Sequence, residues 1–218
     1  IAHDMSKGEQ MSRIVIGDVG CGKTICATAA MYIAVKNGYQ AALMAPTEIL
    51  ATQHYNDLRA IFEALGIKCA LLTGSCTAAT KRKIHAAMQA EIPELRLDVV
   101  IGTQALLSDG AEFIKPGLVI TDEQHRFGVA QRSKLSEKGT DPHLLVMSAT
   151  PIPRTLALIM YGDLEVSVLD ELPPGRQQVD TFLVDESYRA RINAFIRKHV
   201  TEGHQCFVVC PAVEENEE

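Results

Sequence analysis

The sequence has 218 residues, of which 47% are hydrophobic and 22% charged, with a formal net charge of −6. This composition supports a sizeable core and argues against disorder, and the length suits one α/β domain plus part of another. The negative charge does not indicate nucleic-acid binding. It does not exclude it either, because backbone N–H groups, hydroxyls and helix N-termini hold phosphates without adding charge.

No apolar run reaches the ~20 residues that a membrane-spanning helix needs, so we expect no membrane partner. The six cysteines, at positions 21, 26, 69, 76, 206 and 210, form no Cys-x-x-Cys pair and no zinc spacing. They are interpreted as small buried side chains in a reducing compartment, and a cytoplasmic location is expected. Because the sequence starts with Ile1, it is interpreted as a piece of a longer chain.

A glycine-rich segment follows the first predicted strand, Arg13–Ile16, and precedes a predicted helix, Lys23–Lys36. Residues 17–24 fit the pattern G-x-x-x-x-G-K-[ST], in which glycines let backbone N–H groups face phosphate oxygens at a helix N-terminus. Lys23 is expected at the β- and γ-phosphates of ATP, and the Thr24 hydroxyl at Mg²⁺. The predicted phosphate loop comprises Gly17, Gly20, Cys21, Gly22, Lys23 and Thr24.

The second predicted strand, Gln40–Ala45, stops at Pro46, and a helix is predicted over Thr47–Leu65. Thr47 is placed to cap that helix, and Glu48 follows it. A capped helix N-terminus is itself a phosphate site, so capping and phosphate binding both remain open for Thr47.

Two more predicted strands end in short polar turns. The strand Cys69–Leu72 leads into Thr73-Gly74 and a helix through about Gln89, and the strand Leu97–Ile101 ends at Gly102-Thr103. Hydroxyls and glycines at strand ends expose backbone donors, which suits contacts with nucleic-acid phosphates.

An acidic pair follows the predicted strand Leu118–Thr121. Asp122 there can hold the Mg²⁺ shell and Glu123 can orient the attacking water, two roles that phosphoryl transfer requires. A last apolar run, Leu144–Met147, ends at Ser148. Strands that alternate with helices and are almost continuously apolar predict a parallel sheet covered on both faces, with ligands at the carboxyl ends of the strands.

The pattern changes after Leu169. We expect an ATP-binding domain over residues 1–169, a proline- and glycine-containing linker over 170–177, and the start of a truncated second domain over 178–218. Strands at Val179–Val184 and Cys206–Cys210 and a helix at Tyr188–Val200 are predicted in this last part.

The motifs resemble those of superfamily 2 helicases. Residues 45–48 resemble their motif Ia, 101–103 motif Ib, 122–125 motif II and 148–150 motif III, and the longer runs at 17–20, 122–129, 150–156 and 171–176 are similar to the RecG family. The resemblance implies an α/β RecA-like P-loop NTPase domain with a central parallel sheet flanked by helices, plus the start of a second RecA-like domain. Transcription-repair coupling factors are the nearest alternative, but they carry Glu-Glu-Gln where this sequence has residues 123–125.

The RecG resemblance implies an ATP-dependent DNA helicase that drives branch migration at stalled replication forks and Holliday junctions, with ATP and Mg²⁺ as cofactors and branched DNA as partner. The protein is expected to be monomeric. DNA-contact candidates are Pro46, Thr47, Glu48, Thr73, Gly74, Gly102 and Thr103. Coupling candidates are Gln124, His125, Ser148, Thr150 and Arg154. A structural histidine is the alternative for His125, and a lone surface arginine such as Arg154 is more often solvated.

Superfamily 2 motors complete the ATP site with arginines from the second lobe, which contribute ~10³–10⁵ in rate. These arginines and the family's branched-DNA wedge domain are not recognised in the sequence, so the piece alone is expected to be poorly active. A P-loop ATPase without a nucleic-acid substrate and a nucleotide-binding module without turnover remain alternatives.

Overall fold

The computed structural model describes residues 1–107, 112–122, 142–149, 164–171 and 179–209. The chain divides into two compact units, residues 1–174 and 175–218, and this division falls inside the predicted linker. No helix among the described residues is long and apolar enough to cross a membrane.

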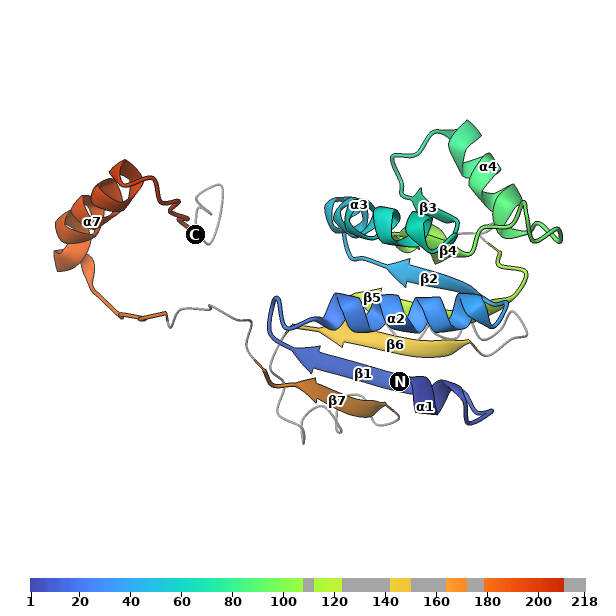
Figure 1. Ribbon diagram of the computed structural model, residues 1–218. Coiled ribbons are helices and arrows are strands. Elements are labelled where there is room, and N and C mark those ends of the chain that lie inside the picture. The colour runs from blue at the N-terminus through green and yellow to red at the C-terminus, as the bar shows by residue number, and fades with distance from the viewer. Residues whose placement is uncertain (108–111, 123–141, 150–163, 172–178, 210–218) are drawn as a thin grey trace, which may run out of the picture. The chain divides into compact units, whose positions relative to one another are not determined.

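The described residues of the first unit form a sheet of seven strands, all parallel to their neighbours, in the order β3-β4-β2-β5-β6-β1-β7. The predicted parallel sheet is therefore confirmed, and Figure 1 shows the strands side by side. The strands are β1 (Ser12–Gly17), β2 (Gln40–Met44), β3 (Cys69–Leu72), β4 (Val99–Gly102), β5 (Pro116–Asp122), β6 (His143–Ser148) and β7 (Glu165–Leu169).

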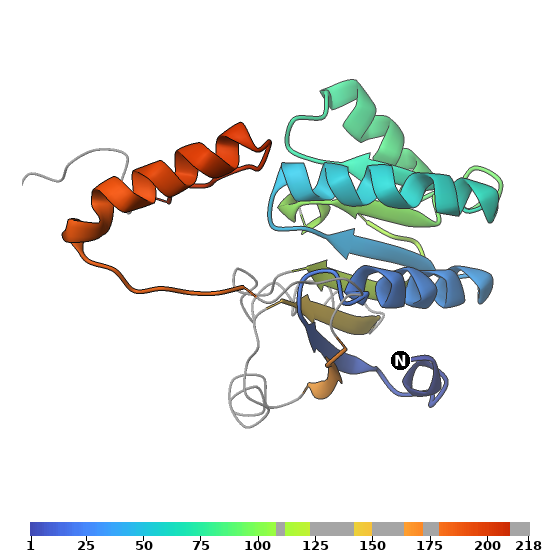
Figure 2. The ribbon, with the colours of Figure 1, turned by 60° about the vertical axis from the view of Figure 1, so that its left-hand side comes forward.

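Helices cover both faces of this sheet. On one face, α2 (Lys23–Lys36) and α3 (Glu48–Ala64) pack against alternate strand residues such as Leu43 and Ile120. On the other face, α4 (Ala78–Met88) and the 3₁₀ turn η1 (Gln104–Leu107) pack against the intervening residues. Figure 2 shows α2 and α3 lying side by side along the sheet. Burial on both faces explains why the central strands are almost continuously apolar.

Gln40 is a polar residue buried within this core, at the start of β2. Its amide nitrogen donates to the carbonyl oxygens of Met88, at 2.9 Å, and Leu97, at 2.8 Å, while its amide oxygen accepts from the N–H of Lys115 at 3.0 Å. One side chain thus satisfies three backbone groups at the edge where the strands begin, and it connects the end of α4 with the segments that lead into β4 and β5.

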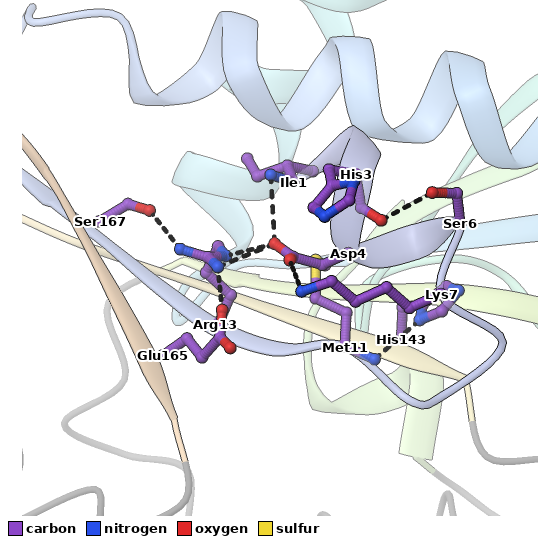
Figure 3. Close-up of polar contacts among 10 residues, drawn as sticks. All are labelled: Ile1, His3, Asp4, Ser6, Lys7, Met11, Arg13, His143, Glu165 and Ser167. Carbon is purple, nitrogen blue, oxygen red and sulfur yellow. Dashed lines mark hydrogen bonds and ion pairs between the residues drawn. The ribbon is translucent and has the colours of Figure 1, made fainter.

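The short helix α1 (Ala2–Met5) and the edge strand β7 were not predicted, and both are attached to β1 by one polar cluster (Figure 3). The Arg13 guanidinium pairs with Asp4 at 2.8 Å, with Glu165, and with the Ser167 hydroxyl at 2.7 Å. Hydrogen bonding from Lys7, together with the Arg13 charge, holds the pKa of Asp4 well below its usual value. This cluster therefore attaches a helix and an edge strand whose local sequence patterns are weak.

In the second unit, the described residues contain a 3₁₀ turn η3 (Glu186–Tyr188) and a helix α7 (Arg189–Thr201), so the predicted helix is confirmed. The predicted strand over residues 179–184 is wrong, and residues 206–209 of the other predicted strand are not in a strand. A strand needs a neighbour to satisfy its N–H and C=O groups. The described part of this unit contains no paired strand and no buried side chain, so these apolar runs stay without regular secondary structure and exposed.

Candidate nucleotide site and nucleic-acid interface

The turn from β1 into α2 has the backbone geometry of a phosphate-binding loop. Gly20 and Gly22 adopt φ angles of 82° and 100°, in the left-handed region that favours glycine. At Gly17, a Cβ would lie 2.5 Å from Cys21 Sγ and 2.9 Å from Leu169 Cβ, so a larger residue would displace the start of the loop. Three glycines thus allow the tight curl that the sequence motif predicts.

Lys23 lies at the first position of α2 and closes this loop. Its Nζ donates to the carbonyl oxygens of Gly17, at 2.7 Å, and Asp18, at 2.8 Å, which places the ammonium group over the loop. No side chain in the described part of the chain caps the first turn of α2. The N–H groups of that turn, the helix dipole and a centred positive charge form a site that fits the phosphates of a nucleotide.

Asp122 ends β5 on the same edge of the sheet, because all the strands are parallel. The strand β6 lies between β5 and β1, and Ser148 at its end is buried beside β1. Asp122 is largely buried, and the hydroxyl of Thr121 before it is buried without a hydrogen-bond partner among the described residues. A carboxylate and hydroxyl oxygens at neighbouring strand ends are hard oxygen ligands of the kind that Mg²⁺ binds.

Asp122 also contacts a residue that the sequence did not single out. His54 Nε2 lies 2.7 Å from Asp122 Oδ2, and both side chains are largely buried, with 12% and 15% exposed. His54 lies on α3, whose core-facing stripe follows helical spacing with Ala51, Leu58 and Phe62 buried. A histidine within an otherwise apolar stripe is the sequence signal that could have singled out His54, although not its partner.

The segment after β2 forms the start of α3, as predicted, and contacts the loop that follows β3. Thr47 caps α3, with its side chain accepting from the N–H of Leu50 at 3.3 Å, so the predicted capping role is confirmed. The Glu48 carboxylate accepts from the N–H of Ser75 at 3.0 Å. Hydrogen bonds from the side chain and backbone of Ser75 lower the pKa of Glu48 below its usual value. Glu48 is therefore engaged with the Thr73-Gly74 loop.

That loop is held from its other side by α4. The Nζ of Lys81 donates to the carbonyl oxygen of Gly74 at 2.7 Å. The hydroxyl of Thr73 is buried and lies 2.9 Å from that of Ser75. A Cβ on Gly74 would lie 2.8 Å from the Glu48 carboxylate, so a larger residue would displace the end of the Glu48 side chain.

The end of β4 completes this region. The N–H of Thr103 donates to the carbonyl oxygen of Leu72 at 3.3 Å, and the N–H of Ala45 donates to Gly102 at 2.8 Å. A Cβ on Gly102 would collide with the Leu72 carbonyl oxygen. The structure thus brings the ends of β2, β3 and β4, with their predicted DNA-contact residues, to one part of the sheet edge. Ser75 and Lys81, which the sequence did not single out, also lie in this region.

Five predicted site residues lie outside the described part of the chain: Glu123, Gln124, His125, Thr150 and Arg154. An open depression of about 670 Å³ lies at the opposite edge, where β5 and β6 begin, and is lined by residues such as Tyr39, Lys115 and His143. In parallel sheets ligands bind at the carboxyl ends of the strands, so this depression is not the candidate nucleotide site.

Comparisons with known proteins agree with this geometry. Residues 2–159 match the profile of the DEAD/DEAH box helicases. The chain is 49% identical over 217 residues to the ATP-dependent DNA helicase RecG of Synechocystis, covering 100% of this chain and 26% of the relative. It is 46% identical to the corresponding protein of Bacillus subtilis, covering 100% of this chain and 31% of the relative.

A solved structure of RecG bound to a three-way DNA junction is similar to the chain, with a TM-score of 0.82 and 43% identity over 97% of this chain and 28% of that one. The helicase MrfA, at 21% identity and a TM-score of 0.67 over 97% of this chain and 35% of that one, shares the fold. The chain spans about a quarter to a third of the length of the curated relatives named above.

Proposed function

The chain belongs to the DEAD/DEAH box helicase family, and we propose that it is the ATP-binding motor lobe of a RecG-type helicase that remodels branched DNA. The substrates would be stalled replication forks and Holliday junctions, and the cofactors ATP and Mg²⁺. The observation that carries this proposal is the joint placement of a phosphate loop and Asp122 at one edge of a parallel sheet. Similarity to RecG proteins over nearly all of this chain supports the choice of substrate.

In the proposed nucleotide site, the N–H groups of residues 17–24 hold the phosphates, and Lys23 neutralises the charge that develops on them. Thr24 and Asp122 would hold Mg²⁺, and the ion would supply positive charge that stabilises the reacting phosphates. Glu123 orients and polarises the attacking water. Ser148 and Thr150 link hydrolysis to movement, and Arg154 reaches DNA or the phosphates. Gln124 and His125 couple the two domains.

In the proposed DNA interface, Thr47, Gly74 and Thr103 present hydroxyl and backbone donors to phosphates, while the buried Thr73 and Gly102 shape the loops beside them. Pro46 shapes the start of this surface. A carboxylate repels phosphates, and that of Glu48 is held by Ser75, so we assign Glu48 the task of fixing the loop at Thr73-Gly74.

The proposal also includes the domain division at residues 1–169, 170–177 and 178–218, a monomeric protein, and action on DNA in the cytoplasm. A second lobe that supplies charge-stabilising arginines is part of it, since ATPases of this class need them for full rate. The isolated chain is therefore expected to hydrolyse ATP slowly and without appreciable stimulation by DNA. A tenfold or larger stimulation of the isolated chain by forked DNA would contradict this expectation.

The test is the ATPase rate of the full-length protein with three-way junctions, linear duplex and no DNA. We expect junctions to stimulate most, the Glu123→Gln variant to bind ATP normally, and its turnover to fall severely, because an amide cannot polarise the water as a carboxylate does. Equal rates with and without DNA would instead favour a P-loop ATPase that acts on another substrate. Stimulation by linear duplex alone would favour a duplex translocase of the transcription-repair coupling type.

A further inference from the structure

The contact between His54 and Asp122 joins two parts of the molecule that the motifs treat as separate. His54 comes from α3, which begins at Glu48 in the proposed DNA interface, and Asp122 ends β5 in the proposed nucleotide site. The two residues are 68 positions apart in the sequence, and their ring nitrogen and carboxylate oxygen lie 2.7 Å apart.

We propose that His54 is a positioning residue that fixes the Asp122 carboxylate for metal binding and connects it to α3. The inference rests on the proposed function, because it assumes that Asp122 holds Mg²⁺ or its water shell. An ionised carboxylate only accepts hydrogen bonds, so Nε2 of His54 is the donor. The bond engages Oδ2, so we assign metal binding to Oδ1.

The surroundings of the pair favour a fixed geometry. Only 12% of the His54 side chain and 15% of the Asp122 side chain are exposed, so water competes weakly for the bond. Ala51 and Leu58, one turn before and after His54, are buried in the core and hold α3 against the sheet. The backbone that carries the imidazole is therefore fixed relative to the sheet.

The same packing makes the contact a physical connection to the DNA side. His54 lies six residues after the first residue of α3, roughly 9 Å along the helix axis at 1.5 Å per residue. Glu48 at the helix start is bonded to the loop at Ser75. A shift of α3 along its axis when DNA engages that end would change the His54–Asp122 geometry directly.

Partners that orient a metal ligand typically change metal affinity by ~10–100-fold when they are removed. The experiment compares His54→Leu, which removes the donor, with His54→Gln, whose amide nitrogen reaches a similar distance. The control is His85→Leu, at a half-buried histidine on α4 outside the proposed sites. All are made in the full-length protein, and circular dichroism checks that each one folds.

The readout is the Mn²⁺ concentration that half-saturates the ADP-bound protein, measured by electron paramagnetic resonance, with Mn²⁺ standing in for Mg²⁺. We expect a rise of about 10-fold or more for His54→Leu and about 3-fold or less for His54→Gln, with no change for His85→Leu. In ATPase assays, raising Mg²⁺ should restore most of the activity of His54→Leu, which damage to the fold would not allow.

Unchanged Mn²⁺ affinity in His54→Leu would overturn the proposal, as would tighter binding, which would mean that His54 competes with the metal. Equal loss in the Leu and Gln variants would also overturn it, since shape rather than the donor would then matter. The Asp122→Asn variant separates failure of the proposed metal site from failure of the proposed role of His54. If it leaves Mn²⁺ affinity unchanged, the metal site under the proposed function fails; if only His54→Leu does so, the role of His54 alone fails.

Discussion

Replacing Gln40 by Leu tests how the buried edge of the sheet is held together. The substitution introduces an apolar side chain of similar size and removes three hydrogen bonds, to the carbonyl oxygens of Met88 and Leu97 and from the N–H of Lys115. Each buried backbone group left without a partner costs about 1–3 kcal/mol. Two of the three bonds are only part-buried, so the lower end applies and the expected loss is about 3 kcal/mol.

A loss of this size is a large fraction of the ~5–15 kcal/mol by which a typical domain is stable. The measurement is urea unfolding of the chain followed by far-ultraviolet circular dichroism, with Gln53→Leu on the exposed face of α3 as control. We expect the midpoint of Gln40→Leu to fall clearly, while the control stays within ~0.5 kcal/mol of the original chain. A loss below about 1 kcal/mol with an unchanged denaturant slope would refute the reasoning, since the three backbone groups would then find other partners.

Three further predictions concern single side chains. Lys23→Ala should weaken ADP binding about 10- to 100-fold in calorimetry, since it removes a charge-assisted contact with the phosphates worth about 1.5–3 kcal/mol, and an unchanged affinity would refute the phosphate loop. The lowered pKa of Glu48 means that its stabilising contribution is present above its ordinary value of 4.5 and is lost as pH falls through the lower folded-state value. Glu48→Gln should therefore reduce the acid dependence of unfolding, and an identical pH profile would contradict the contact with Ser75. Burial raises the pKa of the Cys69 thiol to about 12, so iodoacetamide at pH 8 should label the exposed Cys206 before Cys69. Mass spectrometry can check this order, and equal labelling of the two would contradict it.

Some expectations from the sequence were confirmed because they depend on local chemistry. The helix after the phosphate loop spans Lys23–Lys36 as predicted, since a glycine-rich turn and an Asn-Gly stop mark both of its ends. The cap at Thr47 was also predictable, because its side chain satisfies an N–H group only three residues away.

Other expectations failed where local chemistry does not decide. The apolar run at residues 179–184 has strand composition, yet no neighbouring strand in the described part of the chain pairs with it. The edge strand β7 is the opposite case, because it was not predicted from the sequence and yet it forms. Its pairing with β1 is supported by the contacts of Arg13 with Glu165 and Ser167, more than 150 positions along the chain.

By itself, the sequence determined the phosphate loop, the α/β class and the placement of polar residues at strand ends, because glycine geometry, capping and apolar runs act over a few residues. The tertiary structure decided the strand order and the contacts between motifs. Glu48 meets Ser75 and His54 meets Asp122 only because parallel strands and the packing of α3 bring distant segments together. Such contacts depend on which faces of the core meet, and the local motifs and apolar patterns of a single sequence do not reveal that.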